Sequence, residues 1–536
     1  MEDASRGPCG QTLQVLVCSG FILLLATLTG CSSGPKMALI ATTPDGQGLV
    51  DSGTDLPFVP FGTNYYDPNT GWPPQVWQQF DPKKVAQHFQ VMRDLGVNCA
   101  RVFLAAATFQ PDADTIDEKS LKKLDRLVRI ARKTGVRLIL TGPDHWEGQP
   151  PYWKPDRFAG PEALRALETF WTVLGRRYRG EPAILAWDLL NEPEMPWHID
   201  SWEPMWNTWL QSKYASQEAL KAAWGGELAT DETLGSIRPA RDVAEMGNPR
   251  LHDWQLFREH LADQWVQRQV RALREADPTH PITIGYIQWS FPMVRPGDPH
   301  LYSAFNPRRQ AQWLDFISIH FYPVMGRPFG SRANWDRNLA YLQTMLAYCH
   351  VGKPVVLGEY GWYGGGGPKG RPHLTEDEQG RWIGAEIEAS RRLAQGWLSW
   401  PFADTPEATD MSVFGGLVTR HYIPKSWGLR FRSYAAALFL LAQPTPELPS
   451  FDFAASLTAP MDDLLTMHAE YTQLVQDALA QAGPVPEIEV QTQPMSMQDV
   501  EALRQRQEQR RDEYLRQQAE RNASLSDDQI AEERQR

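Results

Sequence analysis

Two glutamates stand directly after long apolar runs of the sequence. Glu192 comes after residues 183–190 and Asn191, and Glu359 comes after residues 354–358. An acidic side chain at the carboxyl end of a barrel strand points into a cleft, because those strand ends form one face of a parallel barrel. Two such carboxyls can share one reaction, since one donates a proton to a departing oxygen while the other attacks carbon. Glycosidic cleavage needs such a pair, and a separation of about 5 to 5.5 Å selects the route that retains configuration.

A single glutamate at a strand end is a salt-bridge partner as often as a functional group, so one position alone decides nothing. Glu192 and Glu359 end the fourth and seventh runs in a count of eight, which would place them across a barrel axis from each other. Glu194 is an alternative acid, but it stands two residues beyond the strand end. The pattern therefore predicts Glu192 and Glu359 as the catalytic pair.

The elements that must position this pair are short β-rich runs that alternate with helical stretches, eight of each kind. The apolar content of the runs is nearly continuous, as expected of strands covered on both faces. The predicted strands span residues 58–65, 98–104, 137–141, 184–190, 282–287, 316–320, 355–357 and 397–400. An open doubly wound sheet is the alternative, but that fold carries a glycine-rich phosphate turn after its first strand, and residues 62–65 do not form one. The sequence predicts an α/β fold, a closed (β/α)8 TIM barrel.

The predicted helices carry start and stop signals. Asp81 followed by Pro82 predicts a helix start and Gly96 its end, and Ser120 and Gly135 play the same parts in the next helix. Similar patterns predict further helices over residues 161–178, 251–275, 335–349, 376–394 and 431–441.

Three segments resemble the motifs of glycoside hydrolase clan A, closest to the family 5 cellulases and mannanases: residues 187–193, 358–361 and 96–101. The resemblance covers roughly residues 40–445. It implies that Glu192 is the acid/base and Glu359 the nucleophile of a retaining β-glycoside hydrolase. The implied substrate is a β-linked, mannan-like or glucan-like poly- or oligosaccharide, and neither a cofactor nor a metal is expected.

The same resemblance implies a set of substrate-binding residues. In that set the arginine would hold the nucleophile ionised, the asparagine would bind the sugar 2-hydroxyl, the tyrosine would orient the nucleophile and the tryptophan would form a sugar platform. The two histidines would bind hydroxyls and not a metal. The set consists of Arg101, His145, Asn191, His320, Tyr322 and Trp400.

The stretch 196–246 is too long for an ordinary strand-to-helix loop, and it is rich in aromatic residues, including Trp202, Trp206, Trp209, Tyr214 and Trp224. We expect an inserted helical segment over the barrel mouth that shapes the substrate cleft. Residues 209–214, 218–220 and 223–225 resemble a segment of the family 42 β-galactosidases. A β-galactosidase-like exo-enzyme is therefore an alternative.

The first residues resemble an export signal. Residues 13–29 are almost free of charge and have the length of a secretory apolar region, and residues 28–34 around Cys31 resemble the lipobox of bacterial lipoproteins. We expect a signal peptide over 1–30, a lipid anchor at Cys31 on the bacterial cell envelope, and an anchor, linker and hairpin over 31–50. A non-catalytic carbohydrate-binding envelope lipoprotein is a further alternative.

Length and composition limit the domain organisation and the classes of partner that the chain can have. The chain of 536 residues is long enough for one barrel, predicted over 51–445, and an extension over 446–536 that is rich in charge and poor in apolar residues after about Val485. Its net charge of −12 argues against a nucleic-acid partner, because such proteins present a basic face to phosphates. The five cysteines lack the paired spacing of a metal site.

Overall fold

The computed structural model describes residues 37–144, 148–226, 228–240, 248–290, 302–452 and 459–492, with five further helical positions between 505 and 520. The predicted signal peptide and Cys31 lie outside the described residues, and so does His145. None of the helices in the described part of the chain is long and apolar enough to cross a membrane.

Eight parallel strands close into a barrel in the order β10-β11-β4-β5-β6-β7-β8-β9, which confirms the predicted (β/α)8 fold. All eight predicted strands are present, each with one or both ends shifted by one to three residues, and every residue in the observed strands is buried. The strands are β4 (Phe61–Tyr65), β5 (Cys99–Ala105), β6 (Arg137–Asp144), β7 (Ile184–Asn191), β8 (Ile282–Tyr286), β9 (Ile317–Phe321), β10 (Val355–Tyr360) and β11 (Gly396–Ser399).

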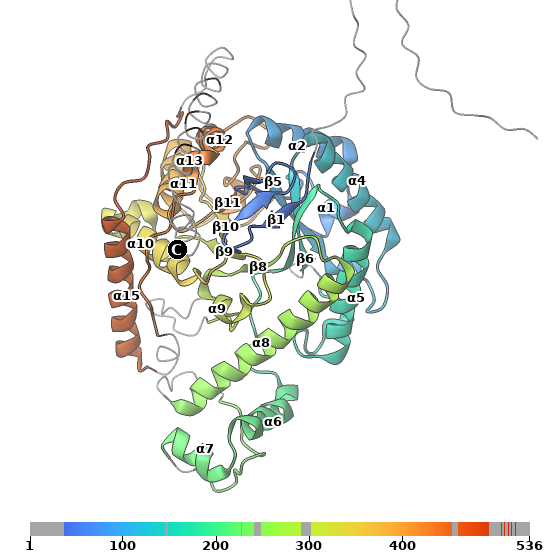
Figure 1. The fold of residues 1–536 in the computed structure, drawn as a ribbon. Helices are drawn as coiled ribbons and strands as arrows, with labels where there is room; N and C mark the ends of the chain where they lie inside the picture. Colours follow the sequence, from blue (N-terminus) through green and yellow to red (C-terminus); the bar gives the residue numbers. More distant parts are fainter. Residues whose placement is uncertain are drawn as a thin grey trace, which may run out of the picture.

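Helices surround the barrel, as Figure 1 shows. The long ones that follow successive strands are α2 (Pro82–Asp94), α4 (Glu118–Thr134), α5 (Pro161–Tyr178), α8 (Pro249–Ala276), α10 (Arg332–Tyr348), α11 (Glu376–Ser390) and α12 (Ser426–Ala436). In the described part of the link from β8 to β9, the only α-helix is the four-residue α9 (Pro307–Gln310). The helical stretch at this one connection is therefore short in the part that the structure describes.

The helix ends follow their capping chemistry. The Asp81 carboxylate accepts hydrogen bonds from the backbone N–H groups of Lys83 and Lys84, as predicted for the start of α2. The start of α4 is three residues earlier than predicted, because Asp117 and not Ser120 caps it. Ser120 donates instead to the carbonyl of Thr108.

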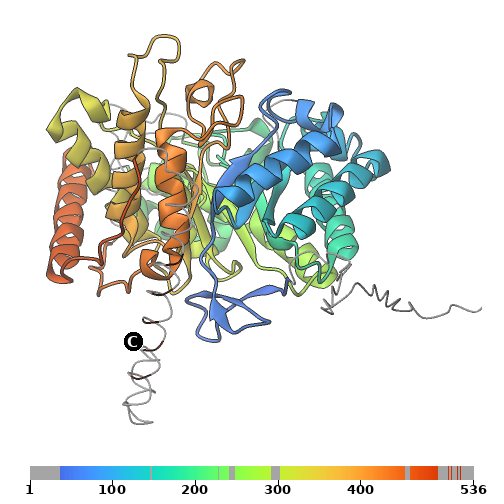
Figure 2. The same cartoon turned by 90° about the horizontal axis from the view of Figure 1, so that it is seen from above.

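A small antiparallel sheet of β1 (Ile40–Thr42), β2 (Leu49–Asp51) and β3 (Leu56–Pro57) covers the amino-terminal end of the barrel (Figure 2). Ile40 and Leu49 pack against the first inward-facing residues of the barrel strands, Cys99 and Ile139 among them. The open end of the barrel is therefore the carboxyl end of its strands, which leads to the longer loops.

The predicted insertion contains α6 (Glu203–Lys213) and α7 (Gln217–Trp224), which lie beside the amino-terminal half of α8 (Figure 1). Ring contacts join Trp206 to Trp254 and Phe257 of α8. At the other end of the chain, α15 (Met461–Gln481) packs against α10.

Candidate active site

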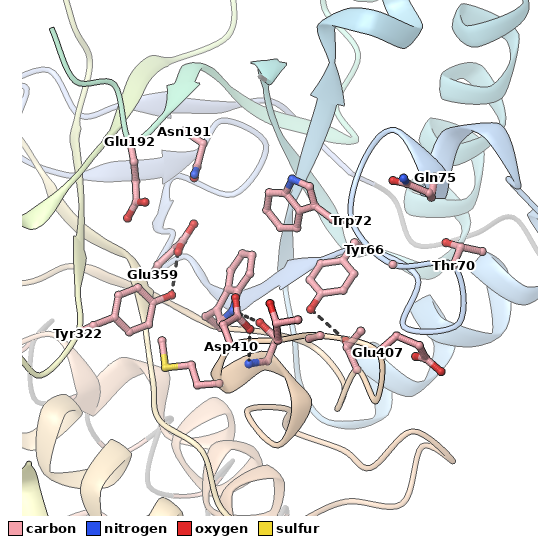
Figure 3. Close-up of a pocket in the computed structure, with 17 residues that line it drawn as sticks. Tyr66, Thr70, Trp72, Gln75, Asn191, Glu192, Tyr322, Glu359, Glu407 and Asp410 are labelled. Carbon is pink, nitrogen blue, oxygen red and sulfur yellow. Dashed lines mark hydrogen bonds between the residues drawn. The ribbon is translucent and has the colours of Figure 1, made fainter. Parts of the chain in front are cut away.

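Glu192 and Glu359 meet at the open end of the barrel, from β7 and β10. A carboxylate oxygen of each and a ring nitrogen of His320 all lie within 4.8 Å of one another. Glu192 has a positive φ of 45°, and its backbone N–H donates to the carbonyl of Gly285 at 2.7 Å. This left-handed backbone conformation is unfavourable for residues other than glycine. It directs the Glu192 side chain toward Glu359 (Figure 3).

Arg101 of β5 holds Glu359 from beneath. Its Nη1 donates to Glu359 Oε1 at 2.7 Å and to Asn64 Oδ1 at 3.1 Å, and its Nε donates to Asp188 Oδ2 at 2.8 Å. Arg101 and Asp188 are fully buried, so both depend on this pairing for solvation. A Cβ at Gly285 would lie 2.4 Å from Arg101 Nη2, which explains the glycine on β8.

His320 of β9 lies between the two acids. Its Nδ1 is 2.9 Å from Glu192 Oε1 and 3.5 Å from Glu359 Oε1. Burial lowers the pKa of His320 to about 4, so the ring is neutral near pH 7. A neutral ring with its proton on Nδ1 donates to Glu192 and adds no charge to the site.

Tyr322 completes the surroundings of Glu359. Its hydroxyl donates to Glu359 Oε2 at 2.8 Å, and Gln288 fixes its backbone by accepting from the Tyr322 N–H at 2.8 Å. Both oxygens of Glu359 therefore accept hydrogen bonds, one from a guanidinium and one from a phenol. The Glu192 carboxylate, by contrast, accepts from His320 alone among the described residues.

Burial raises the pKa of Glu192 to about 7, while Arg101 acts in the opposite direction. Burial also raises the pKa of Glu359 above its ordinary value, against the opposing effects of Arg101 and Tyr322. The predicted pairing with Arg101 is present, but it does not bring this pKa below the ordinary value, because burial outweighs it. Since the strong donors all contact Glu359, a single proton shared by the pair resides on Glu192.

A cavity of about 710 Å³ opens above the two acids. Its wall comes from the loop after β4, the loop after β11 and the ends of β7, β9 and β10. The lining consists of Tyr66, Thr70, Gly71, Trp72, Gln75, Asn191, Glu192, Tyr322, Glu359, Trp400, Thr405, Glu407, Ala408, Thr409, Asp410, Met411 and Ser412.

Aromatic rings form one side of this cavity. Trp72, Tyr66 and Trp400 contact one another, with ring centroids 5.2 to 5.8 Å apart. The indole N–H of Trp400 donates to Ser412 Oγ at 2.9 Å, which fixes its plane. Flat apolar faces beside paired carboxyls fit the C–H faces of a sugar ring.

The loop at 405–412 is held from behind by a buried lysine. Lys425 Nζ donates to Asp404 Oδ1 at 2.9 Å and to the carbonyls of Gly364 and Phe414 at 2.8 and 2.7 Å. Gln379 adds hydrogen bonds to the carbonyls of Trp362 and Phe414. The cleft wall is thus cross-linked to the loop after β10.

The structure brings most of the predicted site residues together. Arg101, His320 and Tyr322 contact the acids, while Asn191 and Trp400 line the cavity. Glu194, the alternative acid, accepts a hydrogen bond from Trp289 Nε1 and is not among the lining residues. No described residue of 196–246 is among them either, so the described part of the insertion does not line this cavity.

Sequence reasoning missed Asp188, Asn64, Tyr66, Trp72 and the loop 405–412. Asp188 had a signal, because a charged residue inside an apolar run must find a partner in the barrel. The loop residues had none, because their place depends on how the loops after β4 and β11 fold.

The donor set of Glu192, His320 and Glu359 has the composition of a metal site. Both Glu359 oxygens already accept hydrogen bonds from Arg101 and Tyr322, and Glu192 Oε1 is engaged by His320. The neighbouring Arg101 cation would repel a metal ion, so the set is better suited to proton transfer.

Two family models match the chain. The model described as Cellulase (glycosyl hydrolase family 5) matches residues 60–223, and the model described as Beta-galactosidase matches residues 157–361. Together they cover β4 to β10 and both glutamates.

Curated relatives are distant. Beta-galactosidase GanA of Bacillus subtilis (strain 168) is 26% identical over 178 residues, which cover 32% of this chain and 25% of that protein. Mannan endo-1,4-beta-mannosidase 8 of Oryza sativa subsp. japonica is 23% identical over 282 residues, or 46% of this chain and 59% of the rice protein. The chain therefore spans less than two thirds of the length of either relative.

Among solved structures, the beta-galactosidase from Rahnella sp. R3 superposes with a TM-score of 0.61 at 17% identity, covering 78% of this chain and 64% of that one. At this identity the likeness concerns the fold, and it agrees with the closed barrel described above.

Proposed function

We propose that this chain, a clan A glycoside hydrolase in its sequence motifs and fold, cleaves β-linked glycosides by double displacement with retention of configuration. The observation that carries the proposal is the approach of carboxylate oxygens of Glu192 and Glu359 to within 4.8 Å. This approach suits direct attack by one carboxylate and leaves no room for the water that an inverting enzyme places between its acids.

In the first step, Glu359 is the nucleophile. Its carboxylate attacks the anomeric carbon as the glycosidic C–O bond breaks, and Glu192 gives its proton to the departing oxygen. The pKa of about 7 keeps Glu192 protonated in mildly acidic solution, as this role requires. The products are a glycosyl ester on Glu359 and a free alcohol.

In the second step, Glu192 acts as a base. Its carboxylate takes a proton from water, the hydroxyl attacks the anomeric carbon, and the ester bond to Glu359 breaks. Arg101 and Tyr322 donate to the Glu359 oxygens and stabilise the carboxylate that leaves. Both acids then have their starting protonation states.

For the substrate, we propose a mannan-like or glucan-like β-linked poly- or oligosaccharide. The family 5 match and the mannanase relatives support this assignment. The family 42 match over residues 157–361 supports an exo-acting β-galactosidase as the second candidate. Product sizes from β-mannan, β-glucan and aryl β-galactoside separate the two, because an exo-enzyme releases only short end products.

The decisive experiment removes the nucleophile. Glu359→Ala should lower kcat by about 10⁴-fold or more, and added azide or formate should restore part of the rate by entering the space of the lost carboxylate. The azide product from Glu359→Ala should have the inverted configuration. Turnover by Glu359→Ala close to that of the unmutated protein would refute the assignment, and inactivity of the unmutated protein on the whole panel would refute hydrolysis.

We also propose that Cys31 carries a lipid that holds the protein on a bacterial envelope membrane. The support is the lipobox-like sequence at residues 28–34 behind an uncharged apolar run. Cys31→Ser should move the protein from the membrane fraction to the soluble fraction and abolish labelling by a fatty acid. Unchanged membrane attachment of Cys31→Ser would contradict the anchor.

A further inference from the structure

The ionised side chains of the described residues that line the cavity all have one sign. Among the described residues that line it, the ionisable acids are Glu192, Glu359, Glu407 and Asp410, and no lysine, arginine or histidine lines it. Arg101 and His320 touch the catalytic acids but are fully buried and lie outside this lining. From the described lining residues, a ligand in the cavity therefore meets carboxylates and neutral groups.

Two of these acids have no part in the proposed reaction. Glu407 and Asp410 belong to the loop 405–412, and Glu407 lies on the far side of the cavity from Glu192 (Figure 3). Both side chains are exposed, and neither forms an ion pair with a residue in the described ranges. Asp410 Oδ1 accepts from the backbone N–H of Ser412, which leaves its second oxygen for another donor.

The charge of Asp410 reaches the centre of the site. Burial is the main cause of the raised pKa values of Tyr322, which contacts the nucleophile, and of Tyr66 on the aromatic wall, and the negative charge of Asp410 adds a smaller effect in the same direction. An anionic group on a substrate that lies between these rings would experience the same field with an unfavourable sign.

A buried acceptor in the cavity indicates which kind of group a ligand would bring. Asn191 is 4% exposed and lines the cavity, and its Oδ1 has no hydrogen-bond partner among the described residues. A buried acceptor without a partner is costly, so its position indicates a ligand that brings a donor, such as a hydroxyl or an ammonium group.

We propose that the cavity selects glycans by charge: it accepts neutral and amino-substituted β-glycans and rejects those that carry carboxylates. Glu407 and Asp410 determine this selectivity. The proposal rests on the proposed function for the identity of the site as a sugar cleft, and it adds the substrate class.

The test uses one neutral β-glycan in three forms: unmodified, partly oxidised to carboxylates at its primary alcohols, and partly converted there to amines. The carboxylated form should have a kcat/KM about tenfold or more below that of the neutral form, and the aminated form should equal or exceed the neutral one. The difference in kcat/KM between the carboxylated and neutral forms should shrink in about 0.5 M salt, because exposed charges are screened.

The matched variants isolate the two carboxylates. In the double variant Glu407→Gln, Asp410→Asn, the difference between carboxylated and neutral forms should fall below about threefold, and asparagine retains the cap on Ser412. Glu447→Gln removes an exposed acid outside the lining and should leave the difference unchanged. Equal cleavage of the three forms by the unmutated protein, or an undiminished difference in the double variant, would overturn the proposal.

Affinity electrophoresis of Glu359→Gln protein in gels that contain each of the three forms measures binding without turnover. Retention by the neutral and aminated gels but not by the carboxylated gel supports charge selection even if hydrolysis fails. Stronger retention by the carboxylated gel, or no retention by any form, overturns it.

Discussion

The cleft wall and the helical insertion are both rich in aromatic residues, but their aromatic rings serve different ends. Trp72 and Trp400 on the wall face the 710 Å³ cavity beside the two acids. Trp206 and Trp209 of the insertion stack on each other at 5.6 Å and pack against α8. Aromatic content alone therefore does not identify a sugar-binding surface.

The difference has a physical cause in how each region satisfies its polar groups. The Asp253 carboxylate of α8 accepts hydrogen bonds from three residues of the insertion, Lys213, Tyr214 and the indole of Trp224, so the polar groups of the insertion are satisfied against α8. On the wall, hydrogen bonds hold the loops from behind and leave the ring faces toward the cavity. Variants can rank the catalytic acids, the wall and the insertion by their effect on turnover.

After the loss expected for Glu359→Ala, the largest effect in this ranking belongs to the acid that follows β7. Glu192→Gln should lower kcat by about 10² to 10⁴-fold on glycans, because the poor leaving group then departs without a proton. An aryl glycoside with an acidic phenol needs no proton, so its first step should be nearly unaffected. A uniform loss on both substrates would show that Glu192 is not the proton donor.

The pH dependence of kcat/KM should report the ionisation of Glu192. Glu192 must be protonated for the first step, and its pKa is about 7, so kcat/KM for glycans should fall as the pH rises through about 7. Glu192→Gln should lack this alkaline decline, because glutamine does not titrate in that range. A decline that persists in the variant would assign it to another group.

A smaller effect is expected from the wall. Trp72→Ala removes a partly exposed ring that lines the cavity, and we expect kcat/KM for oligosaccharides to fall about tenfold, mostly through KM. Initial rates over a range of substrate concentrations measure this split. An unchanged KM would mean that the ring only packs against Tyr66 and Trp400.

The support behind the wall should affect stability more than turnover. Lys425→Met leaves the largely buried Asp404 without its cation, which should destabilise the fold by about 3 to 5 kcal/mol. We expect KM to rise a few-fold because the loop 405–412 loses its cross-link, with kcat less affected. Denaturant unfolding and steady-state kinetics test both parts, and a normal KM in the folded variant would separate the lysine from the cleft.

The barrel and its catalytic acids could be predicted from the sequence, whereas the residues of the cleft wall could not. The eight strands and the acids at their ends were predictable, because a buried parallel strand needs a continuous apolar run and its end has a fixed place on the barrel face. Trp72 and Asp410 were not, because their positions depend on long loops whose folding rests on distant partners such as Lys425 and Gln379. The tryptophans of the insertion suggested a place beside the cleft, but they pack against α8, which the sequence pattern alone does not reveal.

The smallest effect on turnover should come from the insertion, and this expectation tests the comparison most directly. Trp209 is partly exposed like Trp72, but it contacts Trp206 and Phe257 and not the cavity. Trp209→Ala should therefore keep kcat/KM within about twofold of the unmutated protein while lowering Tm by several degrees, because a packed aromatic contact is lost. Kinetics and thermal unfolding of Trp72→Ala and Trp209→Ala, measured side by side, should show opposite patterns. A rise of KM in Trp209→Ala equal to that in Trp72→Ala would show that the insertion reaches the substrate, and the division between the two regions would then fail.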